Sequence, residues 1–382
     1  MRTITFQQPN RLTFGSGCLR ECINYLAGLH LPSVHIISSP SFKALVGEIA
    51  SQLTSAGCII SVDTTIAAEP TIAIFETATA KARDAKAACI FGIGGGSVLD
   101  VAKLVAAFVD SDQKVEETFG IGLLRARKCH LVCMPTTSGT GSEVSPNGIL
   151  LDMTAKLKKG VVSPYLVPDA TFIDPAITRT VPPAITAFTG LDALTHCIEA
   201  YTNKFAHPMV DVYALQGITL CGHFLLRAVR QPDDLEAREG MSLASLYGGL
   251  CLGPVNTAAV HALAYPLGGE FHVPHGISNA LLLPYVFRFN APASPDRHAT
   301  VAVALGIPMQ GSDLETAYAG ADRLNQLVRE CDIDTDLARY GLDPSSISGM
   351  AKSAMTVTRL LKNNPREVSE ADCEKIYKQC FQ

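Results

Sequence analysis

Short apolar runs alternate with amphipathic stretches through the first half of the chain. Four runs are typical of buried strands: VHIISS (34–39), CIISVD (58–63), ACIFGIGGG (88–96) and HLVCMPTT (130–137). Stretches with helical periodicity lie between them, at 41–56, 71–86 and 97–110. This strand–helix–strand rhythm predicts a parallel sheet with helices on both faces.

The pattern changes near residue 183. From there on the apolar positions keep a helical period and show no strand-like alternation, at 185–202, 210–230, 235–253, 256–267, 311–331 and 346–382. Pro182 and Pro183 punctuate the chain at this point. We therefore predict an α/β domain over 1–180 and an all-helical domain over 181–382.

Composition excludes several classes of protein. The chain is 47% apolar and 18% charged, with a net charge of −5 from 31 basic and 36 acidic side chains. These values exclude a disordered chain and give no footprint for a nucleic-acid partner. No apolar run reaches the ~18 residues of a membrane span, and MRTITFQQPNRLTFG lacks the apolar core of a signal peptide. Twelve cysteines without CxxC spacing are typical of reduced, buried thiols in a cytoplasmic protein.

A glycine turn, GIGGGS (92–97), follows one of the predicted strands and opens a predicted helix. Glycines let phosphate oxygens approach the backbone, and helix N–H groups can then bind a pyrophosphate. The string departs from G-x-G-x-x-G because Ser97 occupies the last glycine position. A tight turn without a ligand is the alternative. Asp100 and Lys103, one turn on, are either cofactor contacts or a surface i,i+3 pair.

A second polar loop, PTTSGTGSE (135–143), follows the strand at 130–134. Seven of its nine residues are Thr, Ser or Gly. They would offer hydroxyl and N–H groups at the carboxyl end of a parallel strand, where doubly wound sheets bind ligands. An ordinary Ser/Thr-rich loop is the alternative.

Asp192 and His196 lie four residues apart on a predicted helix, so both side chains point the same way. Further histidines lie in AVHALAYPLGGEFHVPHG (259–276), at positions His261, His272 and His275. One Asp with three His suits Fe(II), Zn, Mn or Co. The alternative is unrelated polar residues on a solvated face. The apolar neighbours of Asp192 favour partial burial and hence a ligand role.

The chain resembles the iron-containing (group III) alcohol dehydrogenases almost end to end. The motifs that carry the resemblance are FGSG (14–17), GGGSxxDxAK (94–103), PTTSGTGSE (135–143), FIDP (172–175), GLDALTHCIEAY (190–201), HxxxxPLGGxFxxPHG (261–276) and NNPR (363–366). The resemblance implies a dinucleotide-binding α/β domain and a helical domain, an architecture shared with dehydroquinate synthase, with the active site in the cleft. It also implies reversible hydride transfer between NAD or NADP and an alcohol or its carbonyl compound.

The resemblance also implies roles for individual residues. The metal ligands would be Asp192, His196, His261 and His275. The residues expected at the cofactor are Gly94, Gly95, Gly96 and Ser97 at the pyrophosphate, Asp100 near the nicotinamide, Thr136, Thr137 and Ser145 in the hydroxyl loop, Lys158 at a ribose and Thr71 on the adenine side.

Two positions depart from the pattern of many family members. Ser39 stands where NAD-using members carry an Asp for the ribose 2′-hydroxyl. Ser39 would not repel a 2′-phosphate, and Lys43 could add charge, so we expect NADP to be accepted, alone or beside NAD; the alternative is that Ser39 caps the helix beginning near Phe42. Tyr265 replaces a second His. It is either a weak acid–base group or a packing residue of the cleft wall.

The sequence therefore predicts a metal-dependent oxidoreductase, with Fe(II) expected and Zn possible. The segments 187–201 and 250–280 contain no Lys or Arg, which favours a small neutral alcohol or aldehyde as substrate. Two alternatives stay open: a metal-dependent lyase similar to 3-dehydroquinate synthase, and a non-catalytic binding protein that keeps the fold. We expect a cytoplasmic homodimer, the dimer from the resemblance alone.

Overall fold

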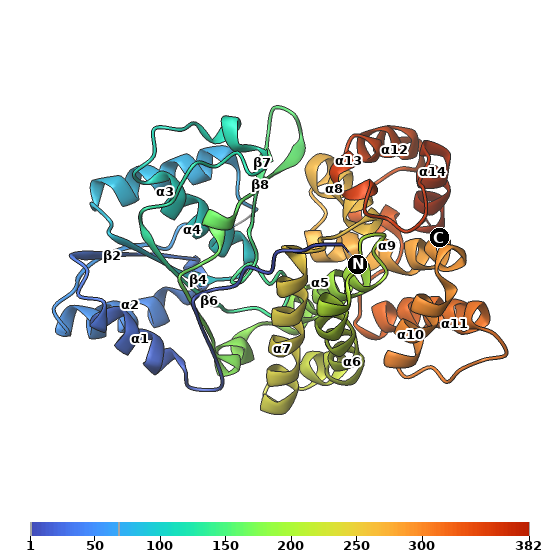
Figure 1. Cartoon of the computed structure of the whole chain (residues 1–382), viewed down its shortest axis with the longest axis horizontal. Helices are drawn as coiled ribbons and strands as arrows, with labels where there is room; N and C mark the ends of the chain where they lie inside the picture. Colours follow the sequence, from blue (N-terminus) through green and yellow to red (C-terminus); the bar gives the residue numbers. More distant parts are fainter. Residues whose placement is uncertain (1, 68, 382) are drawn as a thin grey trace. The chain divides into compact units, whose positions relative to one another are not determined.

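The computed structural model describes residues 2–67 and 69–381 and divides the chain into two compact units (Figure 1). The first, the α/β unit, comprises Phe6–Thr137 and Gly141–Arg179. The second, the helical unit, comprises Ser138–Thr140 and 180–381, together with residues 2–5. The loop at 135–143 thus contributes residues to both units.

The α/β unit contains a six-stranded, all-parallel sheet, as the alternating pattern predicted. The strand order is β1-β9-β6-β4-β2-β3. The strands are β1 (Arg11–Phe14), β2 (Ser33–Ser38), β3 (Ile59–Asp63), β4 (Cys89–Gly94), β6 (His130–Pro135) and β9 (Ala170–Ile173). The helices are α1 (Leu19–Gly28), α2 (Lys43–Ser55), α3 (Ile72–Asp84) and α4 (Gly96–Phe108).

Helices cover both faces of this sheet. Along β6, Leu131 and Cys133 belong to an apolar cluster with α3 and α4. The alternate residues, Val132 and Met134, belong to a second cluster with α1 and α2. Successive side chains of a strand point to opposite faces, and burial on both faces explains why β6 is apolar over most of its length.

A second, three-stranded sheet was missed by the sequence interpretation. It has the order β5-β8-β7 and comprises β5 (Gly120–Ile121), β7 (Asn147–Asp152) and β8 (Leu157–Val162). β7 and β8 pair antiparallel. The Leu151 N–H donates to the Pro70 carbonyl at 2.8 Å, which holds β7 beside the start of α3.

The helical unit contains only helices and connecting segments within its described residues, as predicted. Its helices are α5 (Pro183–Tyr201), α6 (Pro208–Arg230), α7 (Leu235–Leu252), α8 (Ala259–Phe271), α9 (His275–Asn290), α10 (Pro295–Ala304), α11 (Asp313–Glu330), α12 (Ile347–Met355), α13 (Thr358–Leu361) and α14 (Glu370–Gln379). α5 packs against α6, α7 and α9, and from Gly190 to Tyr201 every residue of α5 is buried.

α6 is the one described helix whose length and composition would allow it to cross a bilayer. It packs against α5, α7 and α10, and core helices of soluble proteins have the same length and composition. The helix therefore gives only weak evidence for a membrane.

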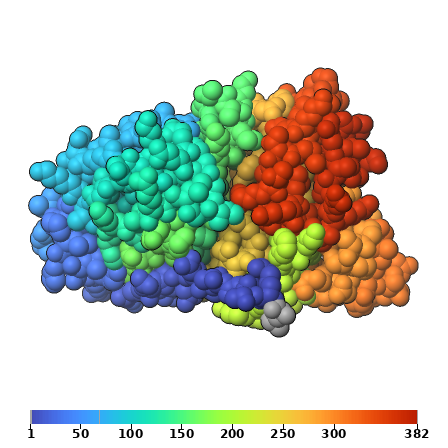
Figure 2. Space-filling view, turned by 45° about the horizontal axis from the view of Figure 1, so that its top comes forward, coloured from blue at the N-terminus to red at the C-terminus, as the bar shows by residue number. Residues whose placement is uncertain are grey.

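The first described residues pack onto the helical unit. The Arg2 guanidinium donates to the carbonyls of Phe205 and Pro254, at 2.7 and 2.8 Å. Figure 2 shows this dark-blue segment lying against the yellow-green part of the helical unit. This explains why residues 2–5 group with residues beyond 180 and not with the sheet that follows them.

All twelve cysteines are unpaired, and all except the half-buried Cys58 are buried. Burial raises the pKa of Cys18 and Cys129 to about 12, and it raises the pKa of the other buried thiols in the same direction. These side chains therefore behave as small apolar groups of the core.

Candidate active site

Three helices of the helical unit bring the predicted Asp and His ligands together. α5 carries Asp192 and His196 one turn apart, α8 carries His261, and α9 begins at His275. The Nε2 atoms of His196, His261 and His275 lie 3.7, 3.6 and 3.8 Å from the same atom, Asp192 Oδ1. Asp192, His196 and His261 are buried and His275 is half-buried. We call these four residues the ligand cage.

The ligand cage fits a divalent transition metal. Two ligands at ~2.1 Å from a tetrahedral ion lie ~3.4 Å apart, slightly less than the separations measured here. Candidate ligand atoms of Asp192, His261 and His275 all lie within 4.8 Å of one another, and His196 approaches the same carboxylate oxygen. Imidazole nitrogen with one carboxylate suits Fe, Zn or Mn better than Mg or Ca.

The cage also keeps its carboxylate charged. Burial would raise the pKa of Asp192, but the imidazoles of His196, His275 and His261 outweigh burial and hold that pKa below its usual range. Burial would lower the pKa of His261, but the carboxylates of Asp192 and Glu199 raise it to about 9. Burial lowers the pKa of His196. A cation inside the cage would therefore meet an ionised Asp192.

Two further residues contact the cage, and the sequence interpretation missed both. Glu199 lies on α5, and its Oε2 is 2.6 Å from His261 Nδ1. Asn279 lies one turn after His275 on α9, and its amide nitrogen donates to Asp192 Oδ1 at 2.7 Å. Their spacings, seven residues after Asp192 and four after His275, place them on the same helix faces as the ligands. That spacing was the available signal.

The remaining histidine of this region does not join the cage. His272 is exposed and ends α8 in a left-handed conformation, with φ of 57°. Tyr265 lies one turn after His261 on α8 and is buried, with 7% of its surface exposed.

The backbone of the predicted pyrophosphate turn leaves little space for side chains at its glycines. Gly94 ends β4, Gly95 is the N-cap of α4, and Gly96 begins the helix. A Cβ on Gly94 would lie 2.6 Å from Val98 Cβ, which is too close for any side chain, and one on Gly95 would lie 3.4 Å from Thr137 Oγ1. Gly95 brings no side chain to cap α4, so N–H groups of the first turn offer the arrangement that binds anions.

Asp100 and Lys103 are not a surface pair, which corrects one of the two readings of that spacing. Lys103 is fully buried. Its ammonium donates to the carbonyls of Ser142 and Ser145, at 2.9 and 3.2 Å. Asp100 accepts from the Ser142 hydroxyl at 2.5 Å and from the Ile149 N–H at 3.0 Å. Both side chains therefore fasten the polar loop to α4, since a buried charge needs such partners.

The polar loop begins beside the glycine turn. The Thr136 N–H donates to the Gly94 carbonyl at 2.9 Å, and the buried Thr136 hydroxyl has no hydrogen-bond partner among the described residues. Thr137 is half-buried against Gly95. Ser145 is buried, and its hydroxyl lies 3.4 Å from the Lys103 ammonium. The Thr136 hydroxyl thus has unused hydrogen-bonding capacity, and within the described part of the chain the Ser145 hydroxyl is held only by this long contact.

The other predicted cofactor residues lie at the ends of secondary-structure elements. Thr71 caps α3, and its hydroxyl accepts from the Ile74 N–H at 3.2 Å. Lys158, on β8, is buried and forms an ion pair with Glu69. Ser39 precedes a short 3-10 turn, Pro40–Phe42, but its side chain forms no capping hydrogen bond. Ser39 thus occupies the N-cap position of this turn without supplying a side-chain capping bond.

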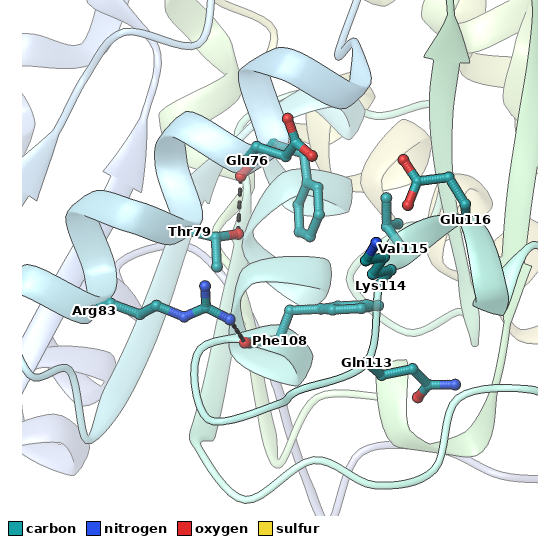
Figure 3. A pocket seen from close by; sticks show the side chains of 9 residues that line it. Glu76, Thr79, Arg83, Phe108, Gln113, Lys114, Val115 and Glu116 are labelled. Atoms are coloured by element: carbon teal, nitrogen blue, oxygen red, sulfur yellow. Dashed lines mark hydrogen bonds between the residues drawn. The ribbon is translucent and has the colours of Figure 1, made fainter.

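A separate cavity of about 680 Å³ opens on the α/β unit (Figure 3). α3, α4 and the segment after α4 line it with Phe75, Glu76, Thr79, Arg83, Phe108, Gln113, Lys114, Val115 and Glu116. The Arg83 guanidinium donates to the Phe108 carbonyl at 2.8 Å. None of the predicted site residues lines this cavity.

Comparisons with known proteins identify the family. Residues 9–175 match the model of the iron-containing alcohol dehydrogenases, and residues 186–381 match that of the family's C-terminal part. Long-chain-alcohol dehydrogenase 1 of Geobacillus thermodenitrificans is 37% identical over 96% of this chain and 94% of its own length.

Solved structures agree with this match. A 1,3-propanediol oxidoreductase is 30% identical and covers both chains fully with a TM-score of 0.95. A sulfoacetaldehyde reductase from Bifidobacterium kashiwanohense in complex with NAD+ is 27% identical, covers 100% of this chain and 99% of its own, and has a TM-score of 0.88. The chain therefore belongs to the iron-containing alcohol dehydrogenase family, whose members are oxidoreductases that act on alcohols and aldehydes.

Proposed function

We propose that this protein transfers a hydride reversibly between NAD or NADP and a small neutral alcohol or its aldehyde or ketone. The observation that carries the proposal is the ligand cage, in which three imidazole nitrogens surround one carboxylate oxygen of a largely buried cluster. Family membership favours this reaction over a lyase and over a non-catalytic role.

The proposed reaction needs a divalent metal ion, with Fe(II) expected from the family and Zn as the alternative. The ligand cage would hold this ion through Asp192, His196, His261 and His275. A bound divalent ion supplies a Lewis acid that polarises the substrate oxygen. The protein's own contribution is to keep Asp192 ionised and to exclude water by burial. The absence of Lys and Arg from 187–201 and 250–280 supports a neutral substrate, because an anionic one would lack a cationic partner from these segments.

On the α/β unit, the turn at Gly94–Ser97 would bind the pyrophosphate through its N–H groups. Asp100 would lie near the nicotinamide end and Thr71 on the adenine side. Thr136, Thr137 and Ser145 would offer hydroxyl groups to the cofactor. Lys158 would exchange its partner Glu69 for a ribose hydroxyl.

The direct test is a substrate panel followed by the absorbance of reduced nicotinamide. The panel pairs small alcohols with NAD+ and NADP+, on protein loaded with Fe(II) or Zn(II). Alcohol-dependent reduction that disappears after chelation supports the proposal. Loaded protein that turns over neither cofactor with any alcohol or aldehyde contradicts it.

Cofactor choice can be tested at Ser39. We expect Ser39→Asp to depress kcat/KM with NADP+ much more than with NAD+, because a carboxylate there would repel the 2′-phosphate. Steady-state kinetics with both cofactors measure the ratio. Ser51→Asp, an exposed position later on α2, controls for the added charge. Equal losses with NAD+ and NADP+ would remove Ser39 from any 2′ role.

The role of Tyr265 can be tested by removing its hydroxyl alone. We expect Tyr265→Phe to change kcat less than about threefold, because Tyr265 is buried within α8 and serves as a packing residue. General acid–base groups typically contribute ~10²–10⁴-fold. A loss in that range, measured at unchanged metal content, would assign Tyr265 a role in proton transfer instead.

We also propose that the enzyme acts in the cytoplasm as a homodimer. The buried, unpaired cysteines support a reducing compartment. The dimer rests on family resemblance, and light scattering of the purified protein measures it.

A further inference from the structure

We propose that Glu199 is a positioning residue that fixes the tautomer and orientation of His261 for metal binding. This inference rests on the proposed metal-dependent function. Glu199 lies seven residues after Asp192 on α5, so the two side chains point to the same face of the helix. The Glu199 side chain is 5% exposed, and it contacts α8 at the point where that helix begins.

The hydrogen bonds of Glu199 determine which His261 nitrogen carries a proton. A carboxylate oxygen accepts hydrogen bonds. Glu199 Oε2 lies 2.6 Å from His261 Nδ1, so the geometry assigns Nδ1 as the donor. When the ring is neutral, as it must be to bind a metal ion, its Nε2 lone pair faces the ligand cage, 3.6 Å from Asp192 Oδ1. The opposite tautomer would direct a hydrogen into the space that the ion needs.

The same carboxylate also anchors the backbone that carries His261. Its Oε1 accepts from the Val260 N–H at 2.6 Å. Ala258, the N-cap of α8, provides no side-chain capping bond, so Glu199 supplies the missing acceptor from another helix. The helix N-terminus favours a negative charge at that position. One side chain thereby fixes both the position of the His261 backbone and the rotation of its ring.

Glu199→Gln separates these two roles. Glutamine keeps the shape but has one acceptor oxygen, so it can accept from Val260 or from His261 but not from both. If its oxygen caps α8, its NH2 group faces His261 Nδ1 and favours the tautomer with a proton on Nε2. Carboxylates and carbonyls that orient metal-binding histidines typically contribute 10–100-fold in metal affinity, and we expect Glu199→Gln to weaken Zn²⁺ binding by about that factor.

The measurement is the Zn²⁺ dissociation constant of the full chain, obtained by competition with a chromogenic chelator. Asp174→Asn is the matched control, because Asp174 is a buried carboxylate that accepts from three backbone N–H groups, those of Gly17, Leu19 and Ala176, without contacting an imidazole. We expect its Zn²⁺ affinity to stay within about threefold of the wild type, far below the 10–100-fold range. Thermal stability of the metal-free variants is recorded in parallel.

A capping role alone would lower the thermal stability of Glu199→Gln and leave its Zn²⁺ affinity within about threefold of the wild type, below the usual effect of a histidine-orienting residue. That result overturns the inference. If Glu199→Gln does not fold, Glu199→Asp replaces it, because the aspartate side chain is one methylene shorter and its carboxylate cannot reach both donors. An unchanged Zn²⁺ affinity of Glu199→Asp would also contradict the inference. A wild-type protein that binds no Zn²⁺ contradicts the proposed function itself, which makes the two failures distinguishable.

Discussion

Replacing His261 with alanine should abolish turnover and weaken metal retention. His261 contributes one of three nitrogens around Asp192 Oδ1, and its removal leaves the buried carboxylate with fewer partners. Lewis-acid catalysis by a metal is worth several kcal/mol, and each 1.36 kcal/mol is tenfold in rate. We therefore expect kcat to fall by ~10³-fold or more. Steady-state kinetics and elemental analysis of the purified variant measure the two effects.

The same substitution should leave the α/β unit unchanged, because His261 belongs to the helical unit. Titration with reduced cofactor, followed by fluorescence, should give the affinity of the wild type. His223→Ala, an exposed position on α6, controls for the loss of a histidine as such. Active wild-type protein without a stoichiometric divalent metal would refute the proposed cage.

Gly276→Ala should destabilise the helical unit and disturb the ligand cage at the same time. A Cβ at this position would lie 2.3 Å from the Phe188 carbonyl oxygen and 2.8 Å from its carbon. Both are backbone atoms of α5, so no side-chain rotation can relieve the contact. α9 must shift against α5, and His275, the preceding residue, shifts with it. Overpacking of this kind costs ~1–3 kcal/mol, occasionally more, and Zn²⁺ affinity should fall with stability.

Thermal and denaturant unfolding measure the stability of Gly276→Ala, and chelator competition measures its metal affinity. Gly349→Ala is the matched control. It lies in α12, and a Cβ there would meet nothing within 4 Å. Alanine is favoured over glycine inside helices by ~1 kcal/mol, so this control should be neutral or stabilising. Equal stability of the two variants would show that the close approach of Gly276 to α5 does not prevent a Cβ at this position.

Periodicity was sufficient for most of the fold and failed at identifiable places. The inner strands β2, β4 and β6 of the large sheet could be predicted because burial on both faces leaves them few polar positions, whereas the short strands β1 and β9 were not predicted. The β7–β8 hairpin could not, because LKKGVV carries two lysines and the connecting residues lack the Asn-Gly or Gly-rich signal of short turns. Lys156 instead adopts the left-handed conformation, with φ of 51°.

The site shows a similar division between local and distant contacts. Asp192 and His196 could be paired from their spacing alone. Glu199 shares their helix face, but its partners Val260 and His261 lie 61 and 62 residues further along the chain, a distance that no helical period reveals. A surface position was one of the two predicted roles of Lys103, because lysines rarely lie in the core. Its burial depends on carbonyls of the polar loop that approach it only in the folded chain.

The distribution of thiols makes the natural chain suitable for attaching a single reporter group. Reagents such as maleimides react with the thiolate form and need physical access to the sulfur. Eleven cysteines are buried and have raised pKa values, whereas Cys58 is half-buried and lies immediately before the edge strand β3. A maleimide dye used at neutral pH should therefore modify Cys58 first. The label would be carried by the α/β unit, and no cysteine would have to be removed by mutagenesis.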